Sequence, residues 1–371
     1  MKIKYLFGGC LFLAVLGIYL FLKLKPPTSV IPGEFEKQEA ILVAYEKLPP
    51  NQADLELLEN QRSTLIDIIA ACHTTVDIKV LVADKESHDS AKTHLASRNV
   101  ILDRIEFIHQ EFDSIWIRDY GPIQLNTPFG TRAWLDFDYH MPGDSWINDE
   151  GIRQQRSLDD NIPTYLAKRQ GVEVQSVDLV LHGGAIASNG ANILVISKAI
   201  FDWNQERYQL SPEQTRAKLT NCFPNLHIEY VAPLAHEPTK HVDMFLVFTS
   251  RNTVVVGNYS PQMDYLNHLR LKGVARQLGQ LTVDGKPLIV ERIFMPPHGE
   301  KIFGGSYTNI VFANGTLLVP DYGVDSDGLA QAITLYNRLL PNWNIRPIYS
   351  GDLVVAEGAL HCVTANIPSS K

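Results

Sequence analysis

The chain has 371 residues, of which 45% are hydrophobic and 20% are charged, so it has enough apolar residues for a large core and lacks the composition of a disordered protein. Its formal net charge is −8, from 33 Lys and Arg against 41 Asp and Glu, and no long basic run occurs, which argues against nucleic acid as a partner. Length alone predicts two domains or one large domain.

The first residues form an apolar stretch long enough to cross a bilayer. Residues 5–22 read YLFGGCLFLAVLGIYLFL, with two lysines before and two after. No good small-residue cleavage site follows, so we predict an uncleaved signal or membrane anchor, a transmembrane helix, over residues 1–25. Residues 26–35 are expected to be a linker. The default orientation of short N-terminal anchors places the bulk of the protein on the periplasmic or extracellular side of the membrane.

A repeated unit accounts for most of the remaining chain. Four short apolar strands, each preceded by turn residues, begin at positions 131, 192, 253 and 316, so they are 61, 61 and 63 residues apart. Another apolar arm, here called the first arm, precedes each turn, which predicts a β-hairpin in every copy. The first arms are residues 123–126, 184–187, 245–249 and 309–312.

Helices and further strands complete the unit. Helical periodicity or strong helix formers follow three of the hairpins, and Pro212 after Ser211 is typical of a first helical turn. The helical stretches are residues 211–220, 263–278 and 327–340. Further apolar strands are expected at residues 77–82, 226–231, 287–294 and 345–350. The unit is therefore strand, strand, helix, strand.

The two remaining hairpin arms lie at opposite ends of the chain, at residues 39–45 and 358–364. Pairing of these arms would complete a fifth unit and close the array into a ring without exposed sheet edges. We therefore predict one closed α/β domain over residues 36–371 in place of two domains.

The chain's most polar and glycine-bearing segments occur at equivalent places in these units. They are WIRDYGP at 116–122, HGG at 182–184, HVD at 241–243, GGSYTN at 304–309 and HC at 361–362. If equivalent first arms line a central axis, all five segments converge on one site. The four cysteines form no C-x-x-C pair, so neither a structural zinc site nor a thioredoxin-like site is indicated, and pairing of Cys72 with Cys222 stays open.

These motifs resemble those of agmatine deiminases and bacterial-type peptidylarginine deiminases, a family of guanidino-group modifying enzymes. The resemblance covers about residues 32–368 and also includes the segments at 306–320 and 358–364. It implies the pentein fold, a five-module α/β propeller of ββαβ repeats around a pseudo-fivefold axis, which matches the period above. It also implies a hydrolase that converts a guanidino group to a ureido group and ammonia.

The resemblance implies a role for each matching residue. A guanidinium is a planar cation and a poor electrophile, so Asp119 and Asp243 look like the carboxylates that hold its N–H groups. Cys362 resembles the nucleophile that forms a covalent intermediate, and His241 resembles the general acid and base. Trp116, Gly184 and Asn309 are the expected substrate contacts. This scheme requires no metal and no cofactor.

Each residue also has a simpler interpretation. A cysteine in an apolar strand is usually a small core residue. If 241–243 were a strand, His241 and Asp243 would share one face and could be surface groups or metal ligands. His182 or His361 would then be the third ligand, but strand alternation in 358–364 would place His361 opposite Cys362.

The substrate remains open between two guanidino compounds. Residues 136–146 lack the arginines with which related peptidylarginine deiminases hold a carboxylate, and this favours the amine agmatine, converted to N-carbamoylputrescine. Membrane export favours a peptidyl-arginine, converted to citrulline. The chain departs from the family at Ala185, where asparagine is common, and in having one glycine shortly before Cys362 where the family has a run.

Other activities would use parts of the same pattern. Amidino transfer would differ only in the group that resolves the covalent intermediate. An acyl-transfer enzyme is disfavoured because a neutral amide gains nothing from two carboxylates. A membrane-tethered receptor for cationic amines is the non-enzyme alternative, and the oligomeric state stays open.

Overall fold

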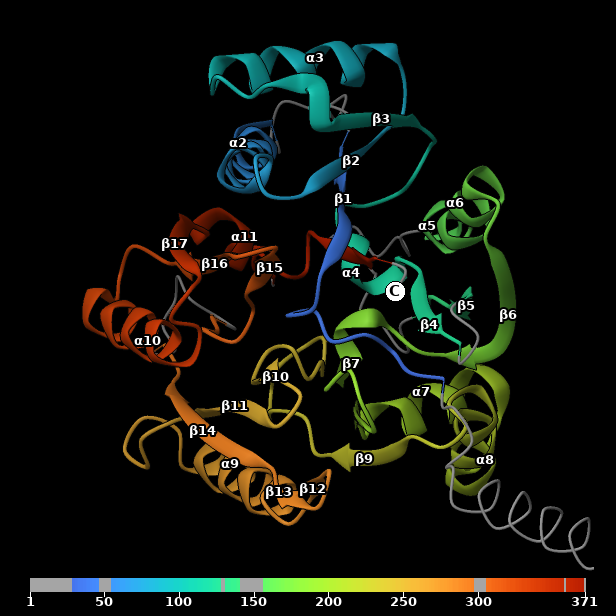
Figure 1. The fold of residues 1–371 in the computed structure, drawn as a ribbon, viewed down its shortest axis with the longest axis vertical. Coiled ribbons are helices and arrows are strands. Elements are labelled where there is room, and N and C mark those ends of the chain that lie inside the picture. Colours follow the sequence, from blue (N-terminus) through green and yellow to red (C-terminus); the bar gives the residue numbers. More distant parts are fainter. Residues whose placement is uncertain are drawn as a thin grey trace, which may run out of the picture.

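The computed structural model describes residues 29–46, 55–127, 131–140, 156–296, 305–356 and 358–369. Within these residues, five sheets of three or four strands surround a common centre, with the longer helices on the outside (Figure 1). Each three-stranded sheet combines one antiparallel pair with one parallel neighbour, and the four-stranded sheet combines one antiparallel pair with two parallel pairs. This is the ring of strand, strand, helix, strand units that the 61- to 63-residue period predicts.

Four units follow one another along the chain. In the first of them, β4 (Ile123–Asn126) pairs antiparallel with β5 (Arg132–Asp138), and β6 (Glu173–Val180) returns parallel to β5. Helices α5 (Ser157–Asp160) and α6 (Ile162–Gln170) lie in this crossover. The second unit comprises β7 (Ile186–Ser188), β8 (Ile193–Ser197), α7 (Ala199–Tyr208), α8 (Pro212–Cys222) and β9 (His227–Val231).

The third and fourth units repeat this order. The third comprises β10 (Leu246–Ser250), β11 (Thr253–Asn258), α9 (Tyr265–Leu278) and β14 (Ile289–Phe294), with a small hairpin of β12 (Thr282–Val283) and β13 (Lys286–Pro287). The fourth comprises β15 (Val311–Ala313), β16 (Thr316–Asp321), α10 (Ser326–Leu339) and β17 (Asn344–Tyr349). A short helix α11 (Gly351–Val355) follows.

The two ends of the described chain meet in the fifth sheet. Strand β18 (Ala365–Pro368) pairs antiparallel with β1 (Gln38–Tyr45), which pairs parallel with β2 (Asp77–Val82). Helix α2 (Leu55–Cys72) joins β1 to β2, and α3 (Lys85–Ser97) and the 3₁₀ helix η2 (Leu102–Arg104) lead to an extra strand, β3 (Ile105–His109). The predicted closure of the ring by its ends is therefore confirmed.

The prediction of a strand over residues 358–364 is wrong. This segment turns, with the Thr364 amide donating to the His361 carbonyl at 3.1 Å, and the first arm of the unit is β18 instead. The turn begins where Gly358 lies against the Trp116 ring, too close to admit a side chain at that position. It ends where the Arg118 amide donates to the Cys362 carbonyl at 3.2 Å.

The central strand of each sheet is apolar on both faces because each face packs into a different hydrophobic core. In β11, Val254 and Val256 pack with Leu271 of α9, whereas Val255 packs into the core of the next unit around Phe312. A strand buried on both faces is a continuous apolar run. This interlocking explains the TVVVG, ILVIS and TLLVP runs, and it holds the first arms rigidly around the axis.

The capping residues agree with the helix predicted at 211–220. Ser211 caps α8 by accepting from the Gln214 amide, and Pro212 occupies the first turn. The predicted membrane helix over residues 1–25 lies outside the described residues, so it stays a prediction. None of the helices described is long and apolar enough to span a bilayer.

Candidate active site

The predicted site residues all lie in short turns that lead into first arms. Asp119 lies in helix α4 (Ile117–Tyr120) before β4, and Gly184 lies in the 3₁₀ helix η3 (Gly183–Ala185) before β7. Asn309 lies before β15, and Cys362 lies before β18. His241 and Asp243 precede β10 in a turn, so the interpretation of 241–243 as a strand is wrong. The ring thus brings five distant segments to one place.

Asp119 and His241 face each other across Gly184. Asp119 Oδ1 lies 3.5 Å from His241 Nδ1 and accepts the Gly184 amide at 3.3 Å. A Cβ atom on residue 184 would lie 2.5 Å from His241 Nδ1 and 2.8 Å from Asp119 Oδ1. Glycine is therefore required here so that the histidine and the carboxylate can approach each other.

Cys362 is held by the amide side chain of Asn309. Its Sγ lies 3.4 Å from Asn309 Nδ2, and Asn309 Oδ1 accepts the His361 amide at 2.8 Å. Both side chains are buried. Asn309 therefore positions the turn that carries Cys362, while Trp116 packs against the same turn at Gly358.

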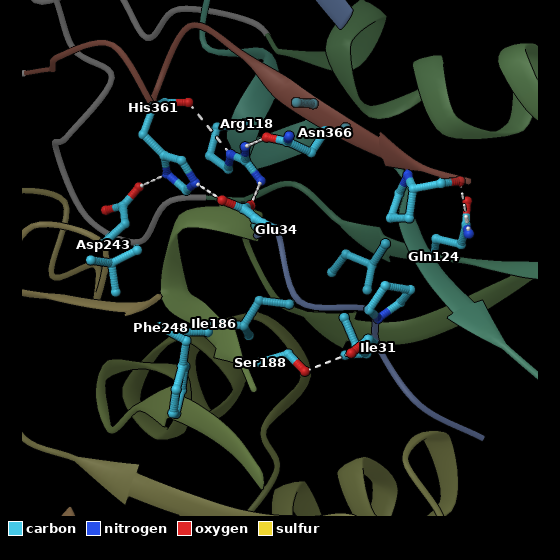
Figure 2. A pocket seen from close by; sticks show the side chains of 18 of the residues that line it. Ile31, Glu34, Arg118, Gln124, Ile186, Ser188, Asp243, Phe248, His361 and Asn366 are labelled. Atoms are coloured by element: carbon cyan, nitrogen blue, oxygen red, sulfur yellow. Dashed lines mark hydrogen bonds and ion pairs between the residues drawn. The ribbon is translucent and has the colours of Figure 1, made fainter. Parts of the chain in front are cut away.

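Asp243 is oriented by a chain of charged side chains that reaches the partly exposed Glu34 in the N-terminal segment. His361 Nδ1 lies 2.7 Å from Asp243 Oδ2, and His361 Nε2 lies 2.8 Å from Glu34 Oε2. Glu34 Oε1 in turn accepts from Arg118 at 2.6 Å (Figure 2). The other carboxylate oxygen of Asp243, Oδ1, is buried and has no hydrogen-bond partner among the residues that the structure describes. One acceptor is thus left for a ligand.

These charges stabilise one another. Burial alone would raise the pKa of Glu34, but Arg118 and His361 lower it to about 2. Burial and Arg118 would lower the pKa of His361, yet Glu34 and Asp243 raise it above its usual value. His361 therefore bridges two carboxylates, which favour its protonated form. Residues 358–364 form a turn, so the strand alternation that was expected to place His361 opposite Cys362 does not occur, and His361 lies beside Asp243.

The N-terminal segment is part of this arrangement. Val30 pairs with Asn126 of β4, and the Ile31 carbonyl accepts from Ser188 at 2.6 Å. Figure 2 shows Ile31 and Glu34 lining a cavity together with Asp243 and His361. Residues 30–34, which we expected in a linker, thus contribute Glu34 to the site. No sequence pattern indicated Glu34, because its partner His361 is 327 positions away.

Charge is disfavoured at the reacting groups of the unliganded site. Burial, reinforced by Asp243, raises the pKa of Asp119 to about 7. Burial also raises the pKa of the Cys362 thiol well above its usual value, and the negative charges of Asp243 and Asp119 add to this effect. Burial lowers the pKa of His241 to about 4. A bound cation would reverse the effect of the carboxylates and favour the thiolate.

Alkylation by iodoacetamide tests this electrostatic picture. Because the thiolate is the reactive form, we expect the rate of Cys362 modification in the free protein to keep rising as pH increases past 8. At pH 8, Asp119→Asn should speed modification about tenfold, since it removes a negative charge beside the thiol. Peptide mass mapping follows Cys362 against Cys72, a buried free thiol outside the site. A rate that is already at its plateau at pH 7 would contradict the picture.

Two further observations concern the free cysteines and the arrangement of metal-binding side chains. Cys72 and Cys222 are separate free thiols, which resolves the open question of their pairing. Within the described ranges, no three His, Cys, Asp or Glu side chains are arranged to hold a metal ion.

Comparison with known proteins agrees with this architecture. The model of the Porphyromonas-type peptidyl-arginine deiminase family matches residues 30–368. The chain belongs to this family. It is accordingly a hydrolase acting on the C–N bonds of linear amidines. The match includes Glu34 and every predicted site residue.

Relatives and solved structures of similar architecture include agmatine deiminases. The agmatine deiminase of Stutzerimonas stutzeri is 24% identical over 314 residues, covering 76% of this chain and 82% of the relative. A substrate-bound agmatine deiminase of C. jejuni has a TM-score of 0.76 at 21% identity, and the match covers 92% of this chain and 97% of that one. The Enterococcus faecalis agmatine deiminase has a TM-score of 0.77 at 19% identity and covers 93% and 97%. These structures confirm the α/β pentein fold.

Proposed function

We propose that this protein hydrolyses the guanidino group of agmatine to N-carbamoylputrescine and ammonia through a covalent intermediate on Cys362. The observation that carries the proposal is a pair of carboxylates whose charges act on the Cys362 thiol, the mostly buried Asp119 and the buried Asp243. Asp243 Oδ1 has no hydrogen-bond partner within the described ranges. A planar cation with several N–H donors satisfies both carboxylates, whereas a neutral amide does not. The names of the relatives support agmatine.

The first half of the reaction transfers the amidino group to the enzyme. The guanidinium lies between Asp119 and Asp243 and lowers the thiol pKa. The thiol proton passes to neutral His241, and the Cys362 thiolate attacks the central carbon. The tetrahedral adduct collapses when its departing nitrogen takes a proton from His241 and leaves as ammonia. The carbon then carries a C–S bond and remains cationic, so the two carboxylates stabilise the intermediate as well as the substrate.

The second half releases the product. His241, now neutral, takes a proton from water, and the hydroxide adds to the same carbon. The C–S bond breaks with its electron pair returning to Cys362, the adduct's hydroxyl loses its proton to solvent as the C=O bond forms, and the ureido product leaves. The proton on His241 then returns to the Cys362 thiolate. Water replaces one amino group of the substrate, so the reaction consumes one water and yields one ammonia without an oxidant or reductant.

A substrate panel tests the proposal. Agmatine, free arginine and a peptide ending in arginine are each incubated with the protein, and the ureido product and ammonia are measured. We expect agmatine to be turned over with the highest kcat/KM. Preference for the peptide would instead support a peptidylarginine deiminase, consistent with the family name and with the predicted membrane anchor. Binding of agmatine without any ureido product would support a receptor.

A further inference from the structure

A second histidine lies behind His241, on the side away from Asp119. His182 is fully buried, its Nδ1 lies 3.1 Å from His241 Nε2, and its Nε2 lies 3.1 Å from the carbonyl oxygen of His140. The His182 ring also stacks on Trp203, with ring centroids 4.6 Å apart and an interplanar angle of 23°. Packing and hydrogen bonds together hold the ring in one orientation.

The hydrogen bonds permit one arrangement of protons. A carbonyl oxygen only accepts, so Nε2 of His182 must carry a hydrogen and donate to His140. In a neutral ring, Nδ1 of His182 is then a lone-pair acceptor. His241 Nε2 must therefore carry the hydrogen that bonds to it, which leaves Nδ1 of neutral His241 without a hydrogen.

Burial keeps both rings in this neutral form. It lowers the pKa of His182 to about 4, and the neighbouring His241 lowers it further, although Asp119 opposes this. Burial likewise lowers the pKa of His241 to about 4, with Asp243 opposing and His361 adding to the effect. The charged groups that act on the pair are thus Asp119, Asp138, Asp243 and His361, and burial outweighs them.

We propose that His182 is a positioning residue that holds the His241 hydrogen on Nε2 and so makes His241 Nδ1 the atom that exchanges protons during the reaction. Nδ1 is the nitrogen that faces Asp119, at 3.5 Å from its Oδ1. The space left by Gly184 brings these atoms together. The kinetic consequence of the assignment rests on the proposed function, whereas the position of the hydrogen does not.

¹⁵N NMR of the histidine rings shows directly which ring nitrogen of His241 carries the hydrogen. In protein labelled with ¹⁵N-histidine, the His241 resonances, identified by their loss in His241→Asn, should at neutral pH have a protonated Nε2 and an unprotonated Nδ1. Finding the hydrogen of His241 on Nδ1 in the parent protein would overturn the proposal, whatever the substrate is.

Two variants of similar shape show what the hydrogen-bond acceptor at position 182 contributes. His182→Asn places a carbonyl oxygen near the position of Nδ1, whereas His182→Leu has nearly the same shape and no acceptor. Both variants lose the Trp203 stack and the bond to His140, so these losses cancel in the comparison. We expect Asn to retain the Nε2-protonated form of His241 and Leu to shift His241 toward the Nδ1-protonated form that bonds to Asp119.

We expect kcat for agmatine to be higher in the variant that keeps the His241 hydrogen on Nε2. The kcat of His182→Leu should lie about tenfold or more below that of His182→Asn, with KM similar in both, because the guanidinium contacts are unchanged. Equal kcat values and equal ring signals in the two variants would refute a positioning role. If agmatine proves not to be the substrate, the NMR comparison still decides the proposal. If His182→Leu fails to fold, the proposal is tested by the parent protein and His182→Asn alone, in both of which the His241 hydrogen should be on Nε2.

Discussion

Replacing Cys362 by serine is expected to reduce kcat for agmatine by a factor on the order of 10⁴ or more. A serine hydroxyl is a far weaker acid than a thiol, and the two carboxylates beside residue 362 would raise its pKa further. Without an anionic nucleophile, attack on a resonance-stabilised guanidinium carbon fails.

Substrate binding should survive this substitution. Asp119, Asp243 and their supporting contacts remain, so agmatine should still raise the melting temperature of Cys362→Ser. Cys222→Ser is the matched control, since Cys222 is a free thiol at the end of α8 and outside the site, and it should keep the parent kcat. Turnover by Cys362→Ser near the parent rate would exclude the covalent mechanism. Loss of turnover together with loss of the thermal shift would indicate a structural role for Cys362.

Replacing Asp119 by asparagine should make the unliganded protein more stable at alkaline pH while it destroys activity. The folded-state pKa of Asp119 is raised to about 7, mainly by burial, against about 3.9 in an unfolded chain. The folded state therefore holds this proton more tightly, and the resulting stability is present below pH 4 and is lost as pH rises through 7. Above pH 8 the ionised carboxylate costs up to about 4 kcal/mol, which asparagine removes.

The same charge is needed when the substrate is bound. A carboxylate that accepts two N–H bonds from the guanidinium is replaced by a neutral amide, so kcat/KM should fall by a factor on the order of 10²–10³. Chemical denaturation from pH 4 to 9, in parallel with agmatine turnover, measures both effects. In the parent the free energy of unfolding should decline between pH 4 and 8, and in Asp119→Asn this decline should be smaller.

Asp136 provides a matched control for the substitution. It is a half-buried carboxylate on β5 that accepts from Thr164, and burial raises its pKa in the same direction. Asp136→Asn should change the pH dependence of stability with the same sign and a smaller size, and leave kcat/KM unchanged. A variant of Asp119 that is less stable than the parent at pH 8 would mean that the carboxylate has a structural role in the empty site.

The elements and the order of the fold follow from short-range patterns. Apolar runs such as residues 253–258 and 316–321 become strands with the predicted bounds, and the spacing between them predicts the ring. Helix α2, which completes the fifth unit, was not predicted, and α6, in the crossover after β5, was not predicted either. Their sequences, LELLENQRSTLIDIIAAC and IPTYLAKRQ, have no strong periodicity of their own, and packing against the sheets stabilises them.

The sequence by itself determined the period, the closure of the ring by its two ends, and the equivalent places in the units of the segments that carry Asp119, His241, Asp243 and Cys362. These features depend on local propensity and on repetition, which a single chain displays. Only the tertiary structure decided which hydrogen-bonding atoms meet. Glu34 reaches His361, His361 orients Asp243, and His182 orients His241. Each of these contacts joins turns from different units, and the direction of a side chain in a turn depends on how the ring closes around it.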